Sequence, residues 1–352
     1  MDTVFVAMSG GVDSSVAASL LKAEGHRVVG ITFQLLPPSF KSIQNPKACC
    51  SYETTLRARR VADALSIPHY VINLRQEFEE FVIEQFKKEY MSGKTPNPCI
   101  LCNQFIKFSS FLSRALPLGA DYIATGHYAR TENTNAGVYL RKGKDPLKDQ
   151  SYFLYSIQKE QLGRILFPLG KHTKFSVLSM AHKIGWKDMD GYRESQDICF
   201  IPGGQYRSFL AQFTTLRKGP VYTVDGSFVG FHKGLPLYTI GQRRGLGIPY
   251  SEPLYVVEIH PADNSLIVGP KNHLLRKKLI AGRPNLLSAA SQNISGKVRY
   301  RQKEQGCHYR VKNGILEVEF NDPVDSITPG QSVVLYNQDI LVGGGIIEAS
   351  AP

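Results

Sequence analysis

A glycine-containing loop near the N-terminus is the stretch best suited to chemistry. Ser9-Gly10-Gly11-Val12-Asp13-Ser14-Ser15 follows an apolar strand expected at residues 4–8 and opens a helix expected at residues 14–24. Glycines let the backbone turn tightly and approach an anion, and the amides at the start of a helix point at that anion. The other interpretation is an ordinary turn with a Ser or Asp cap. The order of strand, loop and helix favours phosphate binding.

This loop differs from a Walker loop, because it lacks the Gly-Lys-Ser/Thr sequence that grips the β- and γ-phosphates. A second stretch, Ala124-Thr125-Gly126-His127-Tyr128, closes a later apolar run. With the strand order 3-2-1-4-5 of a doubly wound sheet, the first and fourth strands are neighbours, and ligands bind beyond their carboxyl ends. Gly126 is therefore expected to face the phosphate loop. His127 is either a packed loop histidine or a substrate contact at the rim of the crevice.

Cysteines stand at positions 49, 50, 99, 102, 199 and 307. The two prolines of Thr95-Pro96-Asn97-Pro98-Cys99-Ile100-Leu101-Cys102-Asn103 are expected to stiffen this loop and to keep it out of a helix. Its Cys-x-x-Cys pair suits a redox pair, half a zinc site or cluster ligands. Zinc needs two more ligands, and the adjacent Cys49-Cys50 pair is poorly spaced to share the ion. Cys199 and Cys307, each taken alone, are expected to be buried apolar thiols.

Hydrophobic patterns predict the elements around these motifs. Strands and helices alternate over the first 130 residues, which predicts an α/β domain with a doubly wound parallel sheet. After about residue 202, short β-rich runs between Gly and Pro residues predict a small β-rich domain and then a β-barrel. The domains are expected at residues 1–204, 205–270 and 271–352. Helices are expected at residues 54–65, 78–90 and 105–116, and the expected strands include residues 237–240 and 297–300.

The net charge of +12 is concentrated toward the C-terminus. Residues 271–312 hold eleven Lys or Arg and a single acidic residue, Glu304. Such a segment is either a solvated face or a surface for a polyanion such as nucleic acid, since bound phosphates release counterions. The chain starts directly with a strand, without the pattern of a signal or transit peptide, and no apolar run is long enough to span a membrane. A cytoplasmic enzyme is expected.

Together the motifs indicate a family. Over essentially its whole length the chain resembles the bacterial tRNA-specific 2-thiouridylases, which belong to the PP-loop ATP pyrophosphatases. The resemblance implies that ATP is split between its α- and β-phosphates, and that sulfur replaces the 2-oxygen of the wobble uridine in tRNAs for Lys, Glu and Gln. The stretches that carry it are SGGVDSS at 9–15, TPNPCILCN at 95–103, ATGHYAR at 124–130, KDQSYFLY at 148–155, ESQDICFI at 194–201, GQRRGLGI at 241–248, RYRQ at 299–302, TPGQS at 328–332 and GGGII at 343–347.

The resemblance also implies roles for single residues. Cys102 resembles the catalytic nucleophile, and Cys199 resembles the cysteine that carries a persulfide, with sulfur supplied by a cysteine desulfurase or a sulfur-carrier relay. Asp13 is a candidate for binding Mg²⁺ or for orientation. The expected ATP site comprises Ala7, Met8, Ser9, Gly10, Gly11, Val12, Asp13, Ser14, Phe33 and Gly126. The target base of the anticodon stem-loop is expected to meet Asn97, Pro98 and Cys99, and other tRNA contacts are expected at His127, Lys148, Asp149, Gln150, Tyr300, Arg301 and Gln331.

Position 99 departs from the pattern of many relatives, which carry Asp where this chain has Cys99. Relatives with Cys there resemble a subgroup proposed to hold a 4Fe–4S cluster through three cysteines, which would be Cys99, Cys102 and Cys199 in this chain. The cluster and the persulfide remain alternatives at this point. Two other functions share some of the motifs: an ATP-dependent ligase that forms amide or guanidine groups, and a non-enzymatic iron–sulfur protein that binds RNA. The three cysteines and the basic barrel argue against the ligase, which would need an amino-acid or glutamine site, and the intact phosphate loop argues against the non-enzymatic protein.

Overall fold

The computed structural model describes residues 1–37, 52–183, 186, 198–201, 206–213, 215–290 and 292–351. The chain forms two compact units. The first comprises Met1–Ile83, Pro98–Gly204 and Asp339–Leu341, and the second comprises Glu84–Asn97, Gln205–Gln338 and Val342–Pro352. An α/β unit precedes β-rich segments, so the predicted fold class is confirmed.

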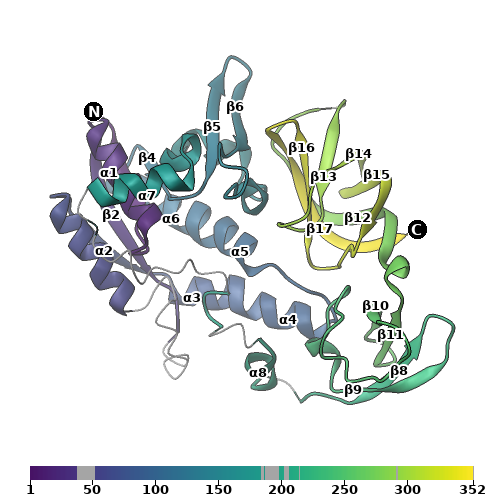
Figure 1. Cartoon of the computed structure of the whole chain (residues 1–352). Coiled ribbons are helices and arrows are strands. Elements are labelled where there is room, and N and C mark those ends of the chain that lie inside the picture. The colour runs from purple at the N-terminus through teal and green to yellow at the C-terminus, as the bar shows by residue number, and fades with distance from the viewer. Residues whose placement is uncertain are drawn as a thin grey trace. The chain divides into compact units, whose positions relative to one another are not determined.

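A parallel five-stranded sheet forms the centre of the first unit (Figure 1). Its order is β3-β2-β1-β4-β7, which is the predicted 3-2-1-4-5 arrangement. Val4 and Val6 pack with the helices on one face, and Phe33 meets Phe111 on the other, with ring centroids 5.0 Å apart. The strands are β1 (Thr3–Ala7), β2 (Arg27–Gln34), β3 (His69–Asn73), β4 (Tyr122–Ala124) and β7 (Ile165–Leu166).

Helices cover both faces of this sheet. Figure 1 shows α1 and α7 side by side, and the two helices share an apolar cluster that includes Val16 and Val177. The α-helices of the first unit are α1 (Val12–Ala23), α2 (Tyr52–Ala64), α3 (Arg75–Phe78), α5 (Pro98–Leu101), α6 (Phe111–Ala115) and α7 (Lys174–Lys183), and α4 (Gln85–Met91) belongs to the second unit. Two π-helices, η2 (Glu79–Glu84) and η3 (Cys102–Ser110), lie between them, and short 3₁₀ turns are η4 (Leu116–Leu118), η5 (Ser151–Leu154), η6 (Lys159–Arg164) and η7 (Pro168–Lys171).

The helix around the Cys-x-x-Cys pair begins earlier than predicted. The prediction placed Pro98 to Cys102 in a loop and began a helix at residue 105. In the structure Pro98 is the first residue of α5, and η3 and α6 continue it to Ala115. Proline suits the first position of a helix, because its missing N–H has no partner there in any case. Cys99 and Cys102 therefore lie on helical turns.

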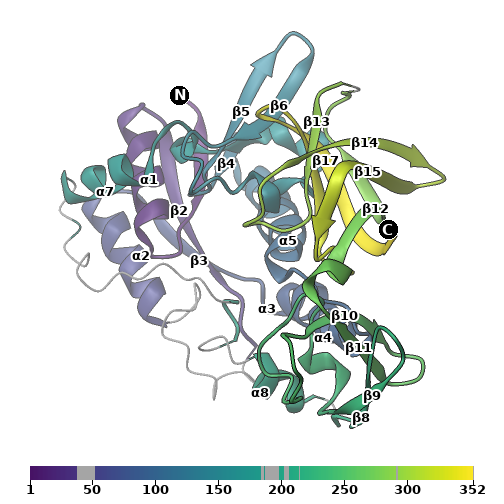
Figure 2. The same cartoon turned by 45° about the vertical axis from the view of Figure 1, so that its right-hand side comes forward.

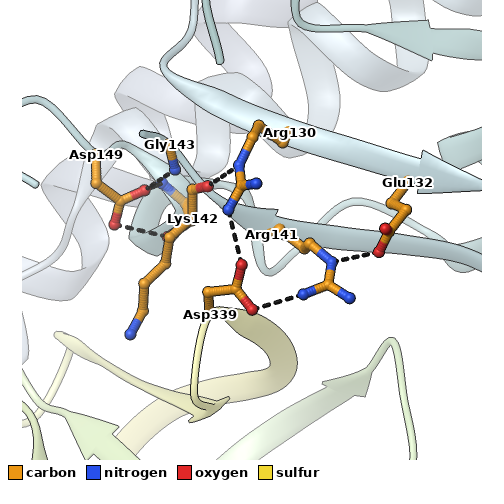
Figure 3. A network of polar contacts seen from close by, with 8 residues as sticks. Arg130, Glu132, Arg141, Lys142, Gly143, Asp149 and Asp339 are labelled. Carbon is orange, nitrogen blue, oxygen red and sulfur yellow. Dashed lines mark hydrogen bonds and ion pairs between the residues drawn. The ribbon is translucent and has the colours of Figure 1, made fainter. Parts of the chain in front are cut away.

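A hairpin that the sequence analysis did not anticipate adds to the first unit. β5 (Ala129–Thr134) pairs antiparallel with β6 (Gly137–Lys142). Figure 3 shows Asp339 accepting hydrogen bonds from Arg130 Nη2 at 2.7 Å and from Arg141 Nη1 at 2.6 Å. Arg141 Nε also pairs with Glu132 at 2.5 Å. β5 is polar apart from Ala129 and therefore gave no apolar strand signal, and the pairs with Asp339 explain why segment Asp339–Leu341 belongs to the first unit.

The second unit contains a four-stranded sheet in the order β10-β11-β8-β9, drawn in green in Figure 2. Its buried core includes Val221, Leu266 and Val268. The strand predicted at residues 237–240 is wrong: Leu235–Leu237 is a 3₁₀ turn, because Pro236 has no N–H to donate to a ladder. The elements are α8 (Tyr206–Ala211), β8 (Gly219–Thr223), β9 (Phe228–His232), β10 (Tyr255–His260) and β11 (Ser265–Gly269).

A closed six-stranded barrel follows, since β12 pairs with both β15 and β17. Its interior is filled by apolar side chains such as Leu316, Phe320 and Val333. The strand predicted at residues 297–300 is misplaced: β13 ends at Lys297, and the chain then turns, with Arg299 bonded to Ile240 O. The strands are β12 (Leu275–Leu286), β13 (Ile294–Lys297), β14 (Gln305–Lys312), β15 (Ile315–Asp325), β16 (Ser332–Asn337) and β17 (Ile340–Ala351). No helix in the described ranges is long and apolar enough to cross a membrane.

Candidate active site

A cavity of about 230 Å³ opens at the carboxyl ends of β1, β2 and β4 in the first unit. Seven of the ten residues expected to bind ATP line it; Gly10, Gly11 and Val12 do not. Two motifs more than a hundred residues apart in the chain thus meet at one hollow, as the strand order predicts. The lining residues are Ala7, Met8, Ser9, Asp13, Ser14, Phe33, Leu35, Lys107, Thr125, Gly126, His127 and Gln150.

The phosphate loop depends on glycine at its tightest point. Gly10 has a φ of +68°, and a Cβ there would lie 2.2 Å from the carbonyl oxygen of Thr54. Gly11 is the residue before α1, and no side chain caps this twelve-residue helix. Ser14 Oγ and Ser15 Oγ instead donate to Gly11 O, at 3.1 and 2.9 Å. The first amides of α1 are therefore not capped by a side chain, which suits an anion.

Gly126 packs directly against the start of α1. A Cβ at this position would lie 2.9 Å from both Asp13 C and Ser14 N. Only a residue without a side chain lets β4 and the phosphate loop approach so closely. The expectation that Gly126 faces the loop is therefore confirmed by geometry.

We expect Gly126→Ala to weaken ATP binding at least about tenfold, because the added methyl group must push the loop away from the cavity. Equilibrium binding of ATP to the full chain checks this. Gly163→Ala is the matched control, since the φ of Gly163 is not positive and a Cβ added there would meet only Val138 Cγ2 at 3.8 Å, an ordinary contact. An alanine at position 126 that binds ATP as tightly as the unchanged chain would contradict this placement of the nucleotide.

Asp13 is tied to two partners that the sequence did not reveal. Lys174 Nζ, at the start of α7, lies 2.8 and 2.9 Å from the two carboxylate oxygens, and Tyr128 Oη donates to Oδ1 at 2.8 Å. The Lys174 side chain is 13% exposed. The ion pair neutralises Asp13 and fixes its direction. A Mg²⁺ ion at this carboxylate must therefore share it with an ammonium group.

Lys107 is the other charged residue that the sequence analysis missed. It is half-buried, lines the cavity and lies close enough to His127 to lower the pKa of that ring. Burial is the larger cause of the low pKa, and His127 is 9% exposed with Nδ1 2.8 Å from Thr125 Oγ1. His127 is therefore neutral near pH 7. With Asp13 paired to Lys174, Lys107 supplies the uncompensated positive charge of the cavity lining.

Lys107 also shares a helix with a cysteine of interest. Cys102 is the first residue of η3, and Lys107 stands five positions later. Because a π-helix bonds residue i to residue i+5, the two lie one hydrogen-bonded turn apart. π-Helical turns are frequent at functional sites. The π-helical geometry of this segment therefore indicates a functional site, and it can be recognised in the structure but not in the sequence pattern.

The residues expected to contact tRNA in the first unit have structural duties as well. Asp149 is buried and accepts hydrogen bonds from Gly143 N at 2.9 Å, drawn in Figure 3, and from Ser151 Oγ at 2.9 Å. Gln150 exchanges hydrogen bonds with the backbone of Tyr128, at 2.9 and 3.0 Å. Lys148 is half-buried in the same turn. Asp149 and Gln150 thus shape the loop beside the cavity.

The expected sulfur-handling cysteines differ in exposure. Cys99 is exposed on α5, Cys102 is buried and Cys199 is half-buried. Among the described residues, no group of three or more Cys, His, Asp or Glu side chains could hold a metal ion, so the three cysteines do not form a ligand set there. Cys49 and Cys50 lie outside the described residues. Cys307 is buried in the barrel as expected, and burial raises the pKa of its thiol to about 12.

The remaining expected tRNA contacts belong to the second unit. Tyr300 and Arg301 follow β13, and Arg301 is exposed. Asn97 is half-buried. Gln331 donates from Nε2 to the carbonyl oxygen of Thr95 at 2.8 Å. The structure therefore brings Gln331 to the segment that precedes Asn97.

Family models match three consecutive segments of the chain. They are described as a tRNA methyl transferase HUP domain at residues 2–203, a tRNA methyl transferase PRC-barrel domain at 207–270 and an aminomethyltransferase β-barrel domain at 276–347.

Similar full-length proteins carry a more specific name. A protein of Halothermothrix orenii named tRNA-specific 2-thiouridylase MnmA is 46% identical over 99% of both chains. The tRNA-specific 2-thiouridylase MnmA 1 of Caldanaerobacter subterraneus is 45% identical, covering 98% of this chain and 97% of its own. A Clostridium botulinum protein of the same name is 43% identical over 98% of this chain and 99% of its own. The chain belongs to the family of tRNA-specific 2-thiouridylases.

Proposed function

We propose that this chain uses ATP to replace the 2-oxygen of the wobble uridine of tRNA with sulfur. The observation that carries the proposal is the cavity in which the phosphate loop, Gly126 and Lys107 meet. Its chemistry suits the activation of an oxygen by ATP, and the cysteines supply a nucleophile for the second step. The family models mention methyl transfer, but the phosphate loop and the cysteines correspond to the chemistry in the relatives' names.

Activation is needed because the C2 carbonyl of uridine is a poor electrophile and its oxygen is a poor leaving group. In the first step O2 attacks the α-phosphorus of ATP, the O2–P bond forms, and pyrophosphate leaves. Membership of the family implies ATP with Mg²⁺. We assign to Lys107 the stabilisation of the negative charge that develops at the α-phosphate, because it is the uncompensated cation of the cavity.

The other residues around the cavity take roles in binding and orientation. We assign the nucleotide to residues 7–14 with Phe33 and Gly126, where uncapped amides of α1 face the phosphates. Asp13, held by Lys174 and Tyr128, orients the loop and contributes an oxygen ligand to Mg²⁺. Neutral His127 contacts the substrate as a hydrogen-bonding group and not as a cation.

Sulfur transfer completes the reaction. We propose that Cys199 carries a persulfide received from a donor protein such as a cysteine desulfurase or a sulfur-carrier relay. Its terminal sulfur attacks C2, the C2–O2 bond breaks, and AMP leaves with that oxygen. The Cys102 thiolate then attacks the inner sulfur of Cys199, which breaks the S–S bond and leaves sulfur on the base. The resulting disulfide must be reduced by a thiol before the next turnover.

A 4Fe–4S cluster at Cys99, Cys102 and Cys199 is the alternative that the resemblance implies. The described residues contain no assembled ligand set of this kind, so no step is assigned to a cluster. Anaerobic reconstitution with iron and sulfide separates the two routes. A visible absorption band lost in each of Cys99→Ala, Cys102→Ala and Cys199→Ala supports the cluster. Full activity of iron-free protein with a persulfide donor supports the two-cysteine route.

The substrate assignment extends to the second unit. We propose that the barrel at residues 271–352, with eleven Lys or Arg and one acidic residue between positions 271 and 312, binds the tRNA backbone. The proposed adenylation domain is residues 1–204, and residues 205–270 form the central domain. Asn97, Pro98 and Cys99 would then meet the target base of tRNAs for Lys, Glu and Gln.

The proposed function is tested by incubating purified chain, unmodified tRNA, ATP with Mg²⁺ and a persulfide donor, and digesting the tRNA to nucleosides. We expect a uridine heavier by the mass difference between sulfur and oxygen, formed only with ATP. A ligase would instead consume an amine and leave uridine unchanged, and a non-enzymatic RNA-binding protein would release no AMP.

A further inference from the structure

Thr95 is held by two other segments of the second unit, the barrel turn at residues 328–331 and the central-domain segment at residues 239–241. Its N–H donates to Pro329 O at 2.9 Å, and its carbonyl oxygen accepts from Gln331 Nε2 at 2.8 Å. Its hydroxyl donates to Thr239 Oγ1 at 3.2 Å. Every polar group of Thr95 is therefore engaged by the barrel turn at residues 328–331 or by the central-domain segment at 239–241. Thr95 stands four residues before Cys99 in the chain.

The barrel turn is itself fixed in place. Gly330 N donates to Ile347 O at 2.9 Å, and Ile347 N donates to Gln331 O at 2.8 Å, so β17 holds both residues. Arg299 Nη2 donates to Ile240 O at 2.9 Å and also to Thr328 Oγ1. One guanidinium group thus joins the central-domain segment to the turn. A side chain on a turn fixed in this way loses little freedom when it bonds to Thr95.

Gly330 shows how closely the two segments approach. Its φ is +89°, and a Cβ would lie 2.8 Å from Thr95 N and 2.9 Å from Thr95 C. Backbone therefore packs on backbone, with Gln331 beside it. Such an approach constrains Thr95, and the constraint passes by covalent connection through Pro96 to Asn97, the last residue of this segment of the second unit.

We propose that Gln331 is a positioning residue for the base-binding segment, and that it acts by holding Thr95. This inference rests on the proposed function, since Asn97, Pro98 and Cys99 are the residues assigned to the target base. The barrel that is assigned to the tRNA backbone then also holds the part of the base-binding segment that belongs to the second unit, which ends at Asn97. The resemblance gives Gln331 a different role, a direct contact to tRNA. One hydrogen of its Nε2 group is donated to Thr95 O at 2.8 Å, and this bond favours the positioning role.

The two roles predict different kinetic defects. If Gln331 binds tRNA directly, Gln331→Ala raises the Kd for tRNA and leaves the rate at saturating tRNA unchanged. If Gln331 positions Thr95, the same variant keeps the Kd within about twofold and lowers the saturating single-turnover rate of thiolation by about 10- to 100-fold, as small misplacements of reacting groups do. We expect the second pattern. Gln331→Glu is expected to match Gln331→Ala, because an ionised carboxylate has no hydrogen to donate to Thr95 O.

Hydrogen exchange supplies a readout that does not depend on activity. We expect Gln331→Ala to speed amide exchange at Thr95 and Asn97, whereas Gln212→Ala, at an exposed position directly after α8, should change neither exchange nor rate. Arg301→Ala provides the comparison for a residue that binds tRNA, with a raised Kd. A raised Kd with an unchanged saturating rate for Gln331→Ala, or unchanged exchange at Thr95 and Asn97, would overturn the proposal. If the unchanged chain makes no 2-thiouridine, the proposed function fails, while the exchange experiment still tests the hydrogen bond to Thr95.

Discussion

Replacement of Cys199 by serine is expected to abolish 2-thiouridine formation while leaving activation of tRNA by ATP intact. Serine is a far weaker nucleophile than a thiolate and cannot carry a persulfide, so a loss of at least about 10³-fold is expected. The cavity that is assigned to ATP does not include Cys199. Pyrophosphate should therefore still form in a single burst of about one per chain, and adenylated tRNA should accumulate.

Rapid-quench measurement of pyrophosphate and mass analysis of the tRNA check this result. Cys307→Ala is the matched control, because that thiol is buried in the barrel and its pKa is raised to about 12, so it takes no part in sulfur chemistry at neutral pH. Absence of the pyrophosphate burst in Cys199→Ser, with the burst present in the control, would show that activation and sulfur transfer are not separate steps.

Lys107→Ala is expected to slow activation itself. Removal of a preorganised charge from a developing oxyanion costs roughly 10²- to 10³-fold in rate. Asp13 is paired with Lys174 and His127 is neutral, so no other cation of the cavity lining replaces Lys107. The pyrophosphate burst should slow by that factor, while the affinity for tRNA stays within about twofold. Lys107→Arg should restore part of the rate, because it keeps the charge with a different geometry.

Lys183→Ala, at an exposed position of α7, is the control for the loss of one positive charge. Stopped or slowed thiolation with a normal pyrophosphate burst in Lys107→Ala would assign Lys107 to sulfur transfer, through its place one π-helical turn from Cys102, and would contradict its role at the phosphate.

The sheet and its crevice were predictable because their signals are local. Alternating strands and helices give the strand order, and this order alone places Gly126 against the loop that starts α1. The hairpin of β5 and β6 was not predicted because β5 is polar and because Arg130 and Arg141 bind Asp339, which is about two hundred residues away in the chain. Ion pairs between residues so far apart in the chain cannot be predicted from the local hydrophobic pattern.

Two charged residues of the site, Lys174 and Lys107, were not predicted from the sequence for a related reason. Lys174 opens an ordinary-looking helix, and only the fold brings it to Asp13. Lys107 stands in a helical stretch between Ile106 and Phe108, both of which are fully buried. A charged residue between two apolar core residues is the feature of the sequence that could have indicated its role. The predicted start of the cysteine helix is too late because proline breaks a helix interior, whereas Pro98 occupies the first helical position, where proline is favoured.

The fate of one oxygen atom tests the central claim most directly. If O2 of the uridine attacks the α-phosphorus of ATP and is later expelled from C2, that oxygen must leave in the phosphate of AMP. The experiment uses tRNA labelled with ¹⁸O at O2 of the wobble uridine, together with ATP, Mg²⁺ and a persulfide donor, in unlabelled water. The account predicts one ¹⁸O atom in each AMP released, with one 2-thiouridine formed per AMP. Unlabelled AMP accompanied by 2-thiouridine would contradict it, because sulfur would then have entered without adenylation of that oxygen.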